Sequence, residues 1–229
     1  MAYTLYTANR NYSSWSLRPW LLMRALDIAF EDRLVPFAGP DNAAEFRSFA
    51  PNGKVPCLHD GDIIVWDSLA IIEYLAERHT DVWPADAMAR AWARCAAAEM
   101  HSGFAALRNI CPMSVGVRAE LLDIPPALQA DIDRISEIFC DGLDRFGGPW
   151  LAGADFSAVD AFFAPVAYRV RSFGLPLAAP AKAWVGRMLS HPAMVEWEAA
   201  ALAETWRDPD HEDEIAAVAT VTADYRASN

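Results

Sequence analysis

Cysteines, basic residues and long apolar runs are all scarce in this 229-residue sequence. The four cysteines are scattered without a C-x-x-C pair, so neither a disulfide framework nor a zinc site is expected and the thiols are predicted to be reduced. The five histidines lack metal-ligand spacing. No run approaches the roughly 18 apolar residues of a membrane span, and no secretory signal opens the chain. We therefore expect a cytoplasmic protein without a bound metal.

Positive charge is in short supply relative to negative charge. The sequence has 19 Lys and Arg against 31 Asp and Glu, which gives a formal net charge of -12. An acidic surface repels nucleic-acid phosphates and anionic lipid headgroups, so neither nucleic acid nor a membrane is an expected partner. Hydrophobic residues make up 54% of the chain and include nine Trp and eleven Phe, enough for a sizeable core.

Short strand and helix patterns alternate over the first eighty residues. Apolar spacing and turn signals predict strands over residues 3–7, 32–37, 55–59 and 63–66. Helices are predicted over residues 15–28, 42–49 and 68–77. The last two strands are separated by Asp60-Gly61, a hairpin signal. The order indicates a small mixed sheet with helices on its faces, an α/β fold.

Strand signals end at a polar segment with Pro84, over residues 80–86, which is the best linker candidate. Beyond it, five helices are predicted between proline and glycine breakers, over residues 87–110, 125–146, 158–173, 181–189 and 193–206. We therefore expect two domains, an α/β domain over residues 1–80 and an all-α domain over residues 87–229. The polar, acidic tail at residues 207–214 is expected to be exposed.

The run N-Y-S-S-W-S-L-R-P, residues 11–19, lies between the first strand and the first helix. Pro19 is tolerated in a helix's first turn, so the helix is predicted to begin near Ser14 to Ser16, with Ser16 as a plausible cap. The free N–H groups and positive end of a helix N-terminus stabilise an anion, and a serine hydroxyl there can donate to a thiolate. Alternatively, the serines only cap the helix and fill the turn.

A second motif, P-N-G-K-V-P-C-L, covers residues 51–58. A cis peptide bond before Pro56 would turn the chain sharply and expose the N–H and C=O groups of Val55. An extended peptide could pair with these groups as an added strand. The alternative is an ordinary X-Pro turn.

A third motif, W-D-S-L-A-I-I-E-Y-L, covers residues 66–75. Asp67 and Ser68 lie where a strand ends and a helix begins. Ser68 and nearby N–H groups can hold a carboxylate, and Asp67 can accept from an ammonium group, which together suits an α-amino-acid head group. The alternative is a plain N-cap.

In this order, the three motifs resemble the glutathione S-transferase family. Three features in this order look like that family. A serine turn comes first, V-P-x-L follows, and the last is an acid or amide followed directly by S-x-A-I-x-x-Y-L. The run S-S-W-S-L-R is similar to S-S-C-S-x-R of its zeta-like class, which includes maleylacetoacetate isomerases. The resemblance covers nearly the whole chain and is strongest in the first domain. It implies a thioredoxin-like α/β domain followed by an all-α domain, glutathione as co-substrate, and a homodimer.

The resemblance also implies roles for individual residues. Ser13 or Ser14 would donate to the glutathione sulfur. Val55, preceding Pro56, would pair with the cysteinyl part, Asp67 and Ser68 would hold the γ-glutamyl end, and Lys54 would approach the glycine carboxylate. Trp15 stands where the zeta-like class has cysteine, which argues against maleylacetoacetate isomerisation.

Further candidates lie in the predicted helical domain. His101 and Arg108 fall on one face of the helix predicted over residues 87–110, and the resemblance places that face, with Trp15, at the second-substrate cleft. The alternative is a partly buried helix with an ion pair. The run F-S-A-V-D, residues 156–160, is interpreted as a structural capping box with Asp160 in place of Glu.

These observations favour a glutathione transferase that activates the glutathione thiolate for attack on an electrophilic, mostly apolar small molecule. Two alternatives of the same fold are a glutathione-dependent isomerase and a non-catalytic protein that binds glutathione or apolar ligands. A thiol oxidoreductase would need a cysteine at the helix turn, where this chain has serines and Trp15.

Overall fold

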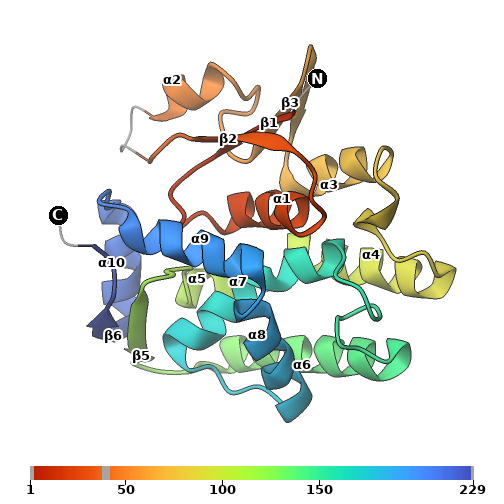
Figure 1. Ribbon diagram of the computed structural model, residues 1–229. Coiled ribbons are helices and arrows are strands. Elements are labelled where there is room, and N and C mark those ends of the chain that lie inside the picture. The colour runs from red at the N-terminus through yellow and green to blue at the C-terminus, as the bar shows by residue number, and fades with distance from the viewer. Residues whose placement is uncertain (1–2, 38–41, 228–229) are drawn as a thin grey trace.

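A four-stranded mixed sheet organises the N-terminal part of the chain in the computed structural model, which describes residues 3–37 and 42–227 (Figure 1). The two predicted domain ranges therefore include short stretches, residues 1–2, 38–41 and 228–229, that lie outside the described residues. The strands are β1 (Tyr3–Thr7), β2 (Phe30–Leu34), β3 (Cys57–Asp60) and β4 (Ile63–Trp66). They are ordered β2-β1-β3-β4, with β1 parallel to β2 and the other neighbours antiparallel.

Within the described residues, three helices accompany this sheet: α1 (Ser14–Ala25), α2 (Asn42–Arg47) and α3 (Ser68–Ala76). Helix α2 lies on one side of the sheet, whereas α1 and α3 lie on the side that faces the rest of the molecule (Figure 1). The predicted order of elements is confirmed, and β1 and β4 have the predicted bounds. Strand β2 begins at Phe30, two residues earlier than predicted, because Phe30 pairs with Tyr3 in the parallel register.

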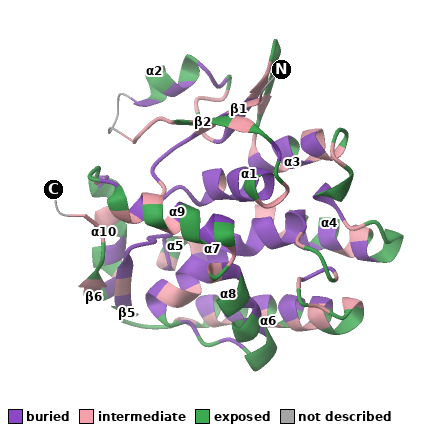
Figure 2. Ribbon diagram, viewed as in Figure 1, coloured by how far each residue is buried: buried purple, intermediate pink, exposed green. Residues whose placement is uncertain are grey.

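The C-terminal part is mostly helical. Its elements are the short 3-10 helix η1 (Thr80–Val82) and the helices α4 (Ala87–Ser102), α5 (Ala105–Ile110), α6 (Pro126–Phe146), α7 (Ala158–Phe173), α8 (Ala179–Leu189), α9 (Pro192–Ala203) and α10 (Pro209–Val218). Helix α7 is the most buried element and packs against α1, α4 and α8 (Figure 2). One apolar core therefore continues from the sheet domain into the helical one.

The single helix predicted over residues 87–110 is wrong, because the chain leaves the helical path between α4 and α5. Gly103 is extended, and Phe104 has a left-handed backbone with φ 59°. A Cβ atom at Gly103 would lie 2.9 Å from the Glu99 carbonyl oxygen, so the break needs glycine at this position. His101 and Arg108 consequently lie on different helices rather than on one helical face.

Two further expectations for the C-terminal part need correction. An antiparallel pair, β5 (Val117–Leu121) and β6 (Ala219–Asp224), adds a second small sheet, so strands do not end at the linker and the domain is not wholly α-helical. The expectation that residues 207–214 are exposed holds for four of them, at 209, 210, 213 and 214, whereas Asp208 is buried. Helix α10 begins in this segment and packs against α5 and β6. The two strands are about a hundred residues apart, so neither could be recognised from its neighbours in the chain.

The motif around Asp160 is structural, as predicted. The buried Asp160 carboxylate accepts hydrogen bonds from the Ser157 N–H at 3.1 Å, the Leu151 N–H at 3.0 Å and the Trp184 indole at 2.9 Å. These contacts fix the loop that leads into α7. Within the described residues, no helix combines the length and the apolar character needed to cross a membrane.

Candidate functional site

A cavity of about 330 Å³ lies where the start of α1 meets the helical domain. Its walls come from the turn at residues 12–15 and the loop at residues 53–55. The helical domain contributes residues of α5 and the segment after it, of α7 and of α10. Six of the predicted site residues line it: Ser13, Ser14, Trp15, Lys54, Val55 and Arg108. The other four, Pro56, Asp67, Ser68 and His101, do not line it.

The serine turn is held by its own hydrogen bonds. The Asn9 carbonyl accepts from the N–H groups of Tyr12 and Ser13, at 3.2 and 2.9 Å. Ser13 is the N-cap residue of α1, so the prediction of Ser16 as the cap is wrong. Ser16 instead lies within the first turn of α1, and its Oγ accepts from the Ala8 N–H at 3.2 Å.

This arrangement distinguishes the two candidate serines. Both side chains reach the cavity, and each residue is 6% exposed. Ser13 Oγ donates to Ser16 Oγ at 2.7 Å, so its proton is already engaged. Ser14 Oγ makes no hydrogen bond to any described residue. Its hydroxyl is therefore free to donate to a bound group.

The loop before β3 presents backbone groups to the same cavity. The Val55-Pro56 peptide bond is cis, as the sequence suggested. The N–H and C=O groups of Val55 have no hydrogen-bond partner in the described part of the chain, so an extended peptide can pair with them. Lys54 beside them forms no ion pair with a described residue, which leaves its ammonium group available to an anion.

Three arginines make one wall strongly positive. Arg108 and Arg169 line the cavity, and Arg18 lies fully buried behind Trp15. The Arg18 and Arg108 guanidinium groups lie over the Trp15 ring, 4.2 and 4.7 Å from its centroid. None of the three Arg18 side-chain nitrogens has a hydrogen-bond partner in the described structure.

The arginine pKa values reflect this crowding. Burial, followed by the charges of Arg108 and Arg169, holds the pKa of Arg18 well below its usual range, with Asp67 as the opposing charge. Burial and then the Arg108 charge lower the pKa of Arg169 to about 10. A negative group in the cavity would relieve this repulsion, so the wall favours an anion.

Asp67, Ser68 and His101 lie outside the lining of the cavity, and the contact of His101 with Trp15 connects the Asp67–His101 pair to it. Asp67 is the N-cap of α3, and its Oδ1 accepts from the Leu69 N–H at 2.8 Å. Its Oδ2 lies 3.4 Å from Nε2 of His101, whose ring meets Trp15 edge-on at 5.3 Å. Burial lowers the pKa of His101, and Asp67 opposes that shift.

Ser68 adds an unpaired polar group to this flank. It is 1% exposed, and its hydroxyl has no hydrogen-bond partner within the described residues. Buried hydroxyl groups are normally paired, so the unpaired one of Ser68, next to the N-cap residue Asp67, is a candidate ligand contact.

The sequence reasoning missed the contribution of α10. His211 and Glu214 line the cavity, and the His211 ring stacks on Tyr12 with ring centroids 4.9 Å apart. The Tyr12 hydroxyl donates to Glu212 at 2.6 Å, which ties α10 to the serine turn. Burial, reinforced by Glu212, raises the pKa of Tyr12 and keeps the phenol protonated. The polar composition of residues 207–214 gave no signal of this packing.

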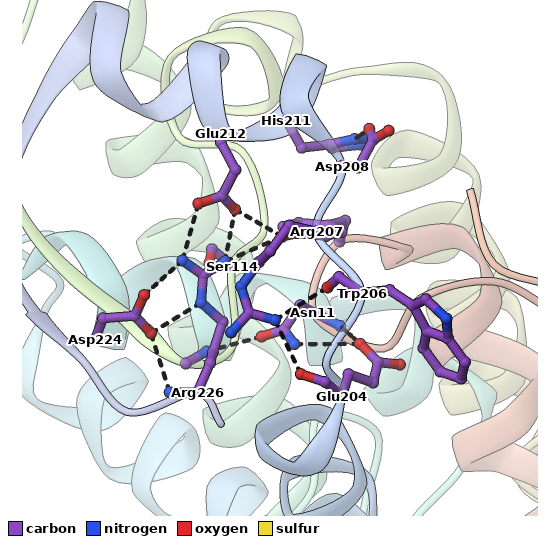
Figure 3. Close-up of polar contacts among 12 residues, drawn as sticks. Asn11, Ser114, Glu204, Trp206, Arg207, Asp208, His211, Glu212, Asp224 and Arg226 are labelled. Carbon is purple, nitrogen blue, oxygen red and sulfur yellow. Dashed lines mark hydrogen bonds and ion pairs between the residues drawn. The ribbon is translucent and has the colours of Figure 1, made fainter. Parts of the chain in front are cut away.

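Arg226 links α10 to β6 (Figure 3). Its guanidinium group donates to both Glu212 and Asp224, at 2.9 Å and 2.7 Å, and to the Tyr12 hydroxyl at 3.0 Å. The Arg226 side chain is only 4% exposed. Over residues 3–37 and 42–227, no group of three or more His, Cys, Asp or Glu side chains is placed to hold a metal ion.

Comparisons with known proteins identify the family to which the chain is similar. Residues 12–78 match the family model described as glutathione S-transferase, N-terminal domain. A probable maleylacetoacetate isomerase of Caenorhabditis elegans is 30% identical over 179 residues, covering 76% of this chain and 81% of the relative. Glutathione S-transferase GstB of Escherichia coli K12 is 30% identical over 181 residues, covering 72% of this chain and 83% of the relative.

A solved structure shares the fold. A glutathione transferase homolog from Burkholderia gl BGR1, solved with bound glutathione, aligns with a TM-score of 0.67 at 22% identity, covering 88% of this chain and 98% of the other. The predicted fold class, a thioredoxin-like α/β domain followed by a helical domain, is thereby confirmed.

Proposed function

The chain belongs to the glutathione S-transferase family, and from that premise we propose that it activates the thiol of glutathione for attack on an electrophilic small molecule. The observation that carries this proposal is the cavity itself. It brings together a free serine hydroxyl, unpaired backbone groups at Val55 and a positive arginine wall.

In this proposal, the Ser14 hydroxyl donates a hydrogen bond to the glutathione sulfur and keeps its own proton. A free thiol titrates near 8.5, so little of it is ionised at neutral pH. The hydroxyl, the N-terminal end of α1 and the charges of Arg108 and Arg169 all stabilise the thiolate and lower that pKa. The thiolate then forms a C–S bond to the electrophilic carbon, and the leaving group departs with the electron pair of its bond.

The remaining predicted residues would bind the rest of glutathione. Val55 pairs its backbone with the cysteinyl part, and Lys54 meets the glycine carboxylate. Ser68 and Asp67 hold the γ-glutamyl end, a role supported by the unpaired Ser68 hydroxyl. Trp15, Arg108 and His101 would act on the second substrate, His101 through its contact with Trp15.

The electrophile would be mostly apolar, since Trp15, Phe37, Phe46 and Met113 line the cavity. We further propose a cytoplasmic homodimer whose α/β domain spans residues 1–80 and whose helical domain spans residues 87–229. The thiols of Cys57 and Cys111 are buried and form no disulfide, which fits a reducing compartment.

A glutathione-dependent isomerase is the second candidate. It is favoured by the relative named as a maleylacetoacetate isomerase and by an arginine wall suited to a carboxylate. The presence of Trp15 instead of the cysteine of the zeta-like class argues against that particular reaction.

The decisive experiment measures turnover and binding together. Glutathione is titrated calorimetrically, and its conjugation to an aryl chloride such as 1-chloro-2,4-dinitrobenzene is followed by absorbance, alongside a panel of cis-alkene acids for isomerisation. Conjugation supports the transferase, and isomerisation alone supports the second candidate. Glutathione binding without any turnover supports the binding-only alternative, and no binding overturns the proposal.

A further inference from the structure

An Asp-His pair stands at the mouth of this cavity, on an element that the sequence did not connect with it. His211 lines the cavity and its Nδ1 is hydrogen-bonded to the carboxylate of Asp208 (Figure 3). The Asp208 side chain is 9% exposed and that of His211 is 29% exposed. A carboxylate bonded to Nδ1 fixes that nitrogen as the protonated one, so Nε2 carries the free lone pair.

Two stacked aromatic rings fix the orientation of the His211 ring. Its face stacks on Tyr12, next to the serine turn, and on Phe37, at centroid distances of 4.9 and 5.4 Å. The interplanar angles are 24° and 22°, so both aromatic rings lie nearly parallel to the imidazole.

The helix that carries the pair is itself anchored. Glu212, the residue after His211, accepts from both Tyr12 and Arg226, and Arg226 also holds Asp224 of β6. This network, centred on the buried Arg226 side chain, therefore holds the pair against Tyr12, the residue before Ser13 and Ser14. Such preorganisation is what an acid-base group requires.

We propose that His211, oriented by Asp208, is the acid-base residue of this cavity. The inference rests on the proposed function and assigns the proton that the thiol must lose. The Nε2 atom takes the S–H proton of glutathione, which leaves a thiolate beside an imidazolium that Asp208 stabilises. The C–S bond then forms, the C–Cl bond of an aryl chloride breaks, and chloride leaves. The proton passes from His211 to water before the next cycle.

The charges around His211 suit this role. Glu214 lines the same cavity on the following turn of α10, and Lys54, Arg108 and Arg169 line it from the opposite elements. The arginines stabilise the thiolate that remains, whereas Asp208 and Glu214 stabilise the imidazolium. The competing explanation is purely structural: Asp208 is the N-cap residue of α10, and its bond to His211 could serve only to hold the first turn of that helix, although its carboxylate accepts no backbone N–H there.

Three variants separate the two explanations. His211→Gln keeps a donor for Asp208 but cannot accept and release the thiol proton. We expect it to lose roughly 100-fold in kcat, the usual scale for a general base, while the Kd for glutathione changes less than twofold. His211→Ala should show the same loss, and added imidazole should restore part of its turnover. The matched control is Asp213→Asn, which is exposed on the same helix and should retain the parent's rate.

The acid-base role of His211 and a purely structural role predict opposite results for these variants. A loss in His211→Gln together with imidazole rescue of His211→Ala supports the acid-base role. Parental turnover in His211→Gln, or a His211→Ala defect that imidazole leaves unchanged, overturns it. Where His211→Ala does not fold, as judged by circular dichroism, the His211→Gln rate decides alone. A parent protein that neither binds nor turns over glutathione refutes the proposed function instead, before any variant is compared.

Discussion

Ser13 and Ser14 are adjacent and equally buried, but their hydroxyl groups are in different states. Ser13 donates to Ser16, and Ser16 in turn holds the Ala8 N–H at the end of β1. Ser14 has no such partner among the described residues. The first serine therefore stabilises the turn, and the second can act on a ligand.

Ser14→Ala should consequently raise the pKa of bound glutathione. A hydrogen bond to a charged group contributes about 1.5–3 kcal/mol, and one pKa unit corresponds to about 1.4 kcal/mol. We expect an increase of about one to two pKa units, read from thiolate absorbance against pH, with a nearly unchanged Kd. Ser13→Ala is the matched control and should shift this pKa by less than half as much. A larger shift in Ser13→Ala than in Ser14→Ala would reverse the assignment.

Asp160 gives a prediction about stability and pH. Burial raises its pKa from 3.8 to about 6, although four hydrogen bonds, one of them from its own backbone N–H, oppose the shift. The folded protein therefore holds this proton more tightly than the unfolded chain. The resulting stability is complete below about pH 4 and is lost as the pH rises through about 6, a change of about 3 kcal/mol.

The measurement compares the parent with Asp160→Asn, which cannot titrate at this position. Urea unfolding from pH 4 to pH 7 should show the free energy of unfolding of the parent, relative to the variant, falling as the pH rises. A constant or rising difference would mean that Asp160 is ionised throughout this range.

Among the elements, α10 and β6 are the least expected and depend most on a single side chain. The Arg226 side chain is 4% exposed and joins Glu212 of α10 to Asp224 of β6 and to Tyr12. Replacing Arg226 removes its hydrogen bonds to both carboxylates and leaves Glu212 with the Tyr12 hydroxyl as a donor. Because Glu212 and Asp224 remain partly exposed to solvent, the penalty is smaller than for a wholly buried pair.

We expect Arg226→Met to lower the free energy of unfolding by about 1–3 kcal/mol and to speed amide hydrogen exchange in residues 209–224. Arg33→Met is the matched control, since the Arg33 pair with Glu31 is exposed and such pairs contribute about 0–1 kcal/mol. Equal effects of the two substitutions would show that the network does not hold α10.

At the scale of the whole molecule, the free edge of the sheet is unusually apolar. Strand β4 ends the strand order β2-β1-β3-β4 and exposes Ile63, Ile64 and Trp66, at 47%, 41% and 43%. Exposed apolar edges are normally protected by charge or covered by a partner. This edge is therefore the proposed contact between two copies of the chain.

Trp66→Glu should convert the proposed homodimer into a monomer, because an uncompensated charge would be buried at the interface. Multi-angle light scattering at micromolar concentration measures the change. Val195→Glu, at a 52% exposed position on α9, is the control and should remain dimeric. A parent with monomeric mass would reject the dimer itself.

The local parts of the fold could be predicted because their signals lie close together in the chain. Apolar spacing, the Asp60-Gly61 hairpin signal and the proline and glycine breakers gave the order of the sheet domain and most helices. The break at Gly103 was missed, because an isolated glycine is tolerated in a helix. The need for glycine at this position comes from the Glu99 carbonyl oxygen, whose closeness is visible only in the structure. The β5-β6 pair was missed because short strands depend on partners that are distant in sequence.

By itself, the sequence determined the family, the fold class and six residues of one cavity, because these follow from motifs and patterns carried by contiguous residues. Only the tertiary structure decided which serine has a free hydroxyl, that Arg18 lies unpaired behind Trp15, and that His211 reaches the serine turn. Hydrogen-bond partners and buried charges depend on what folding brings together across long separations. The contact between Tyr12 and Glu212, two hundred residues apart, has no trace in the local sequence.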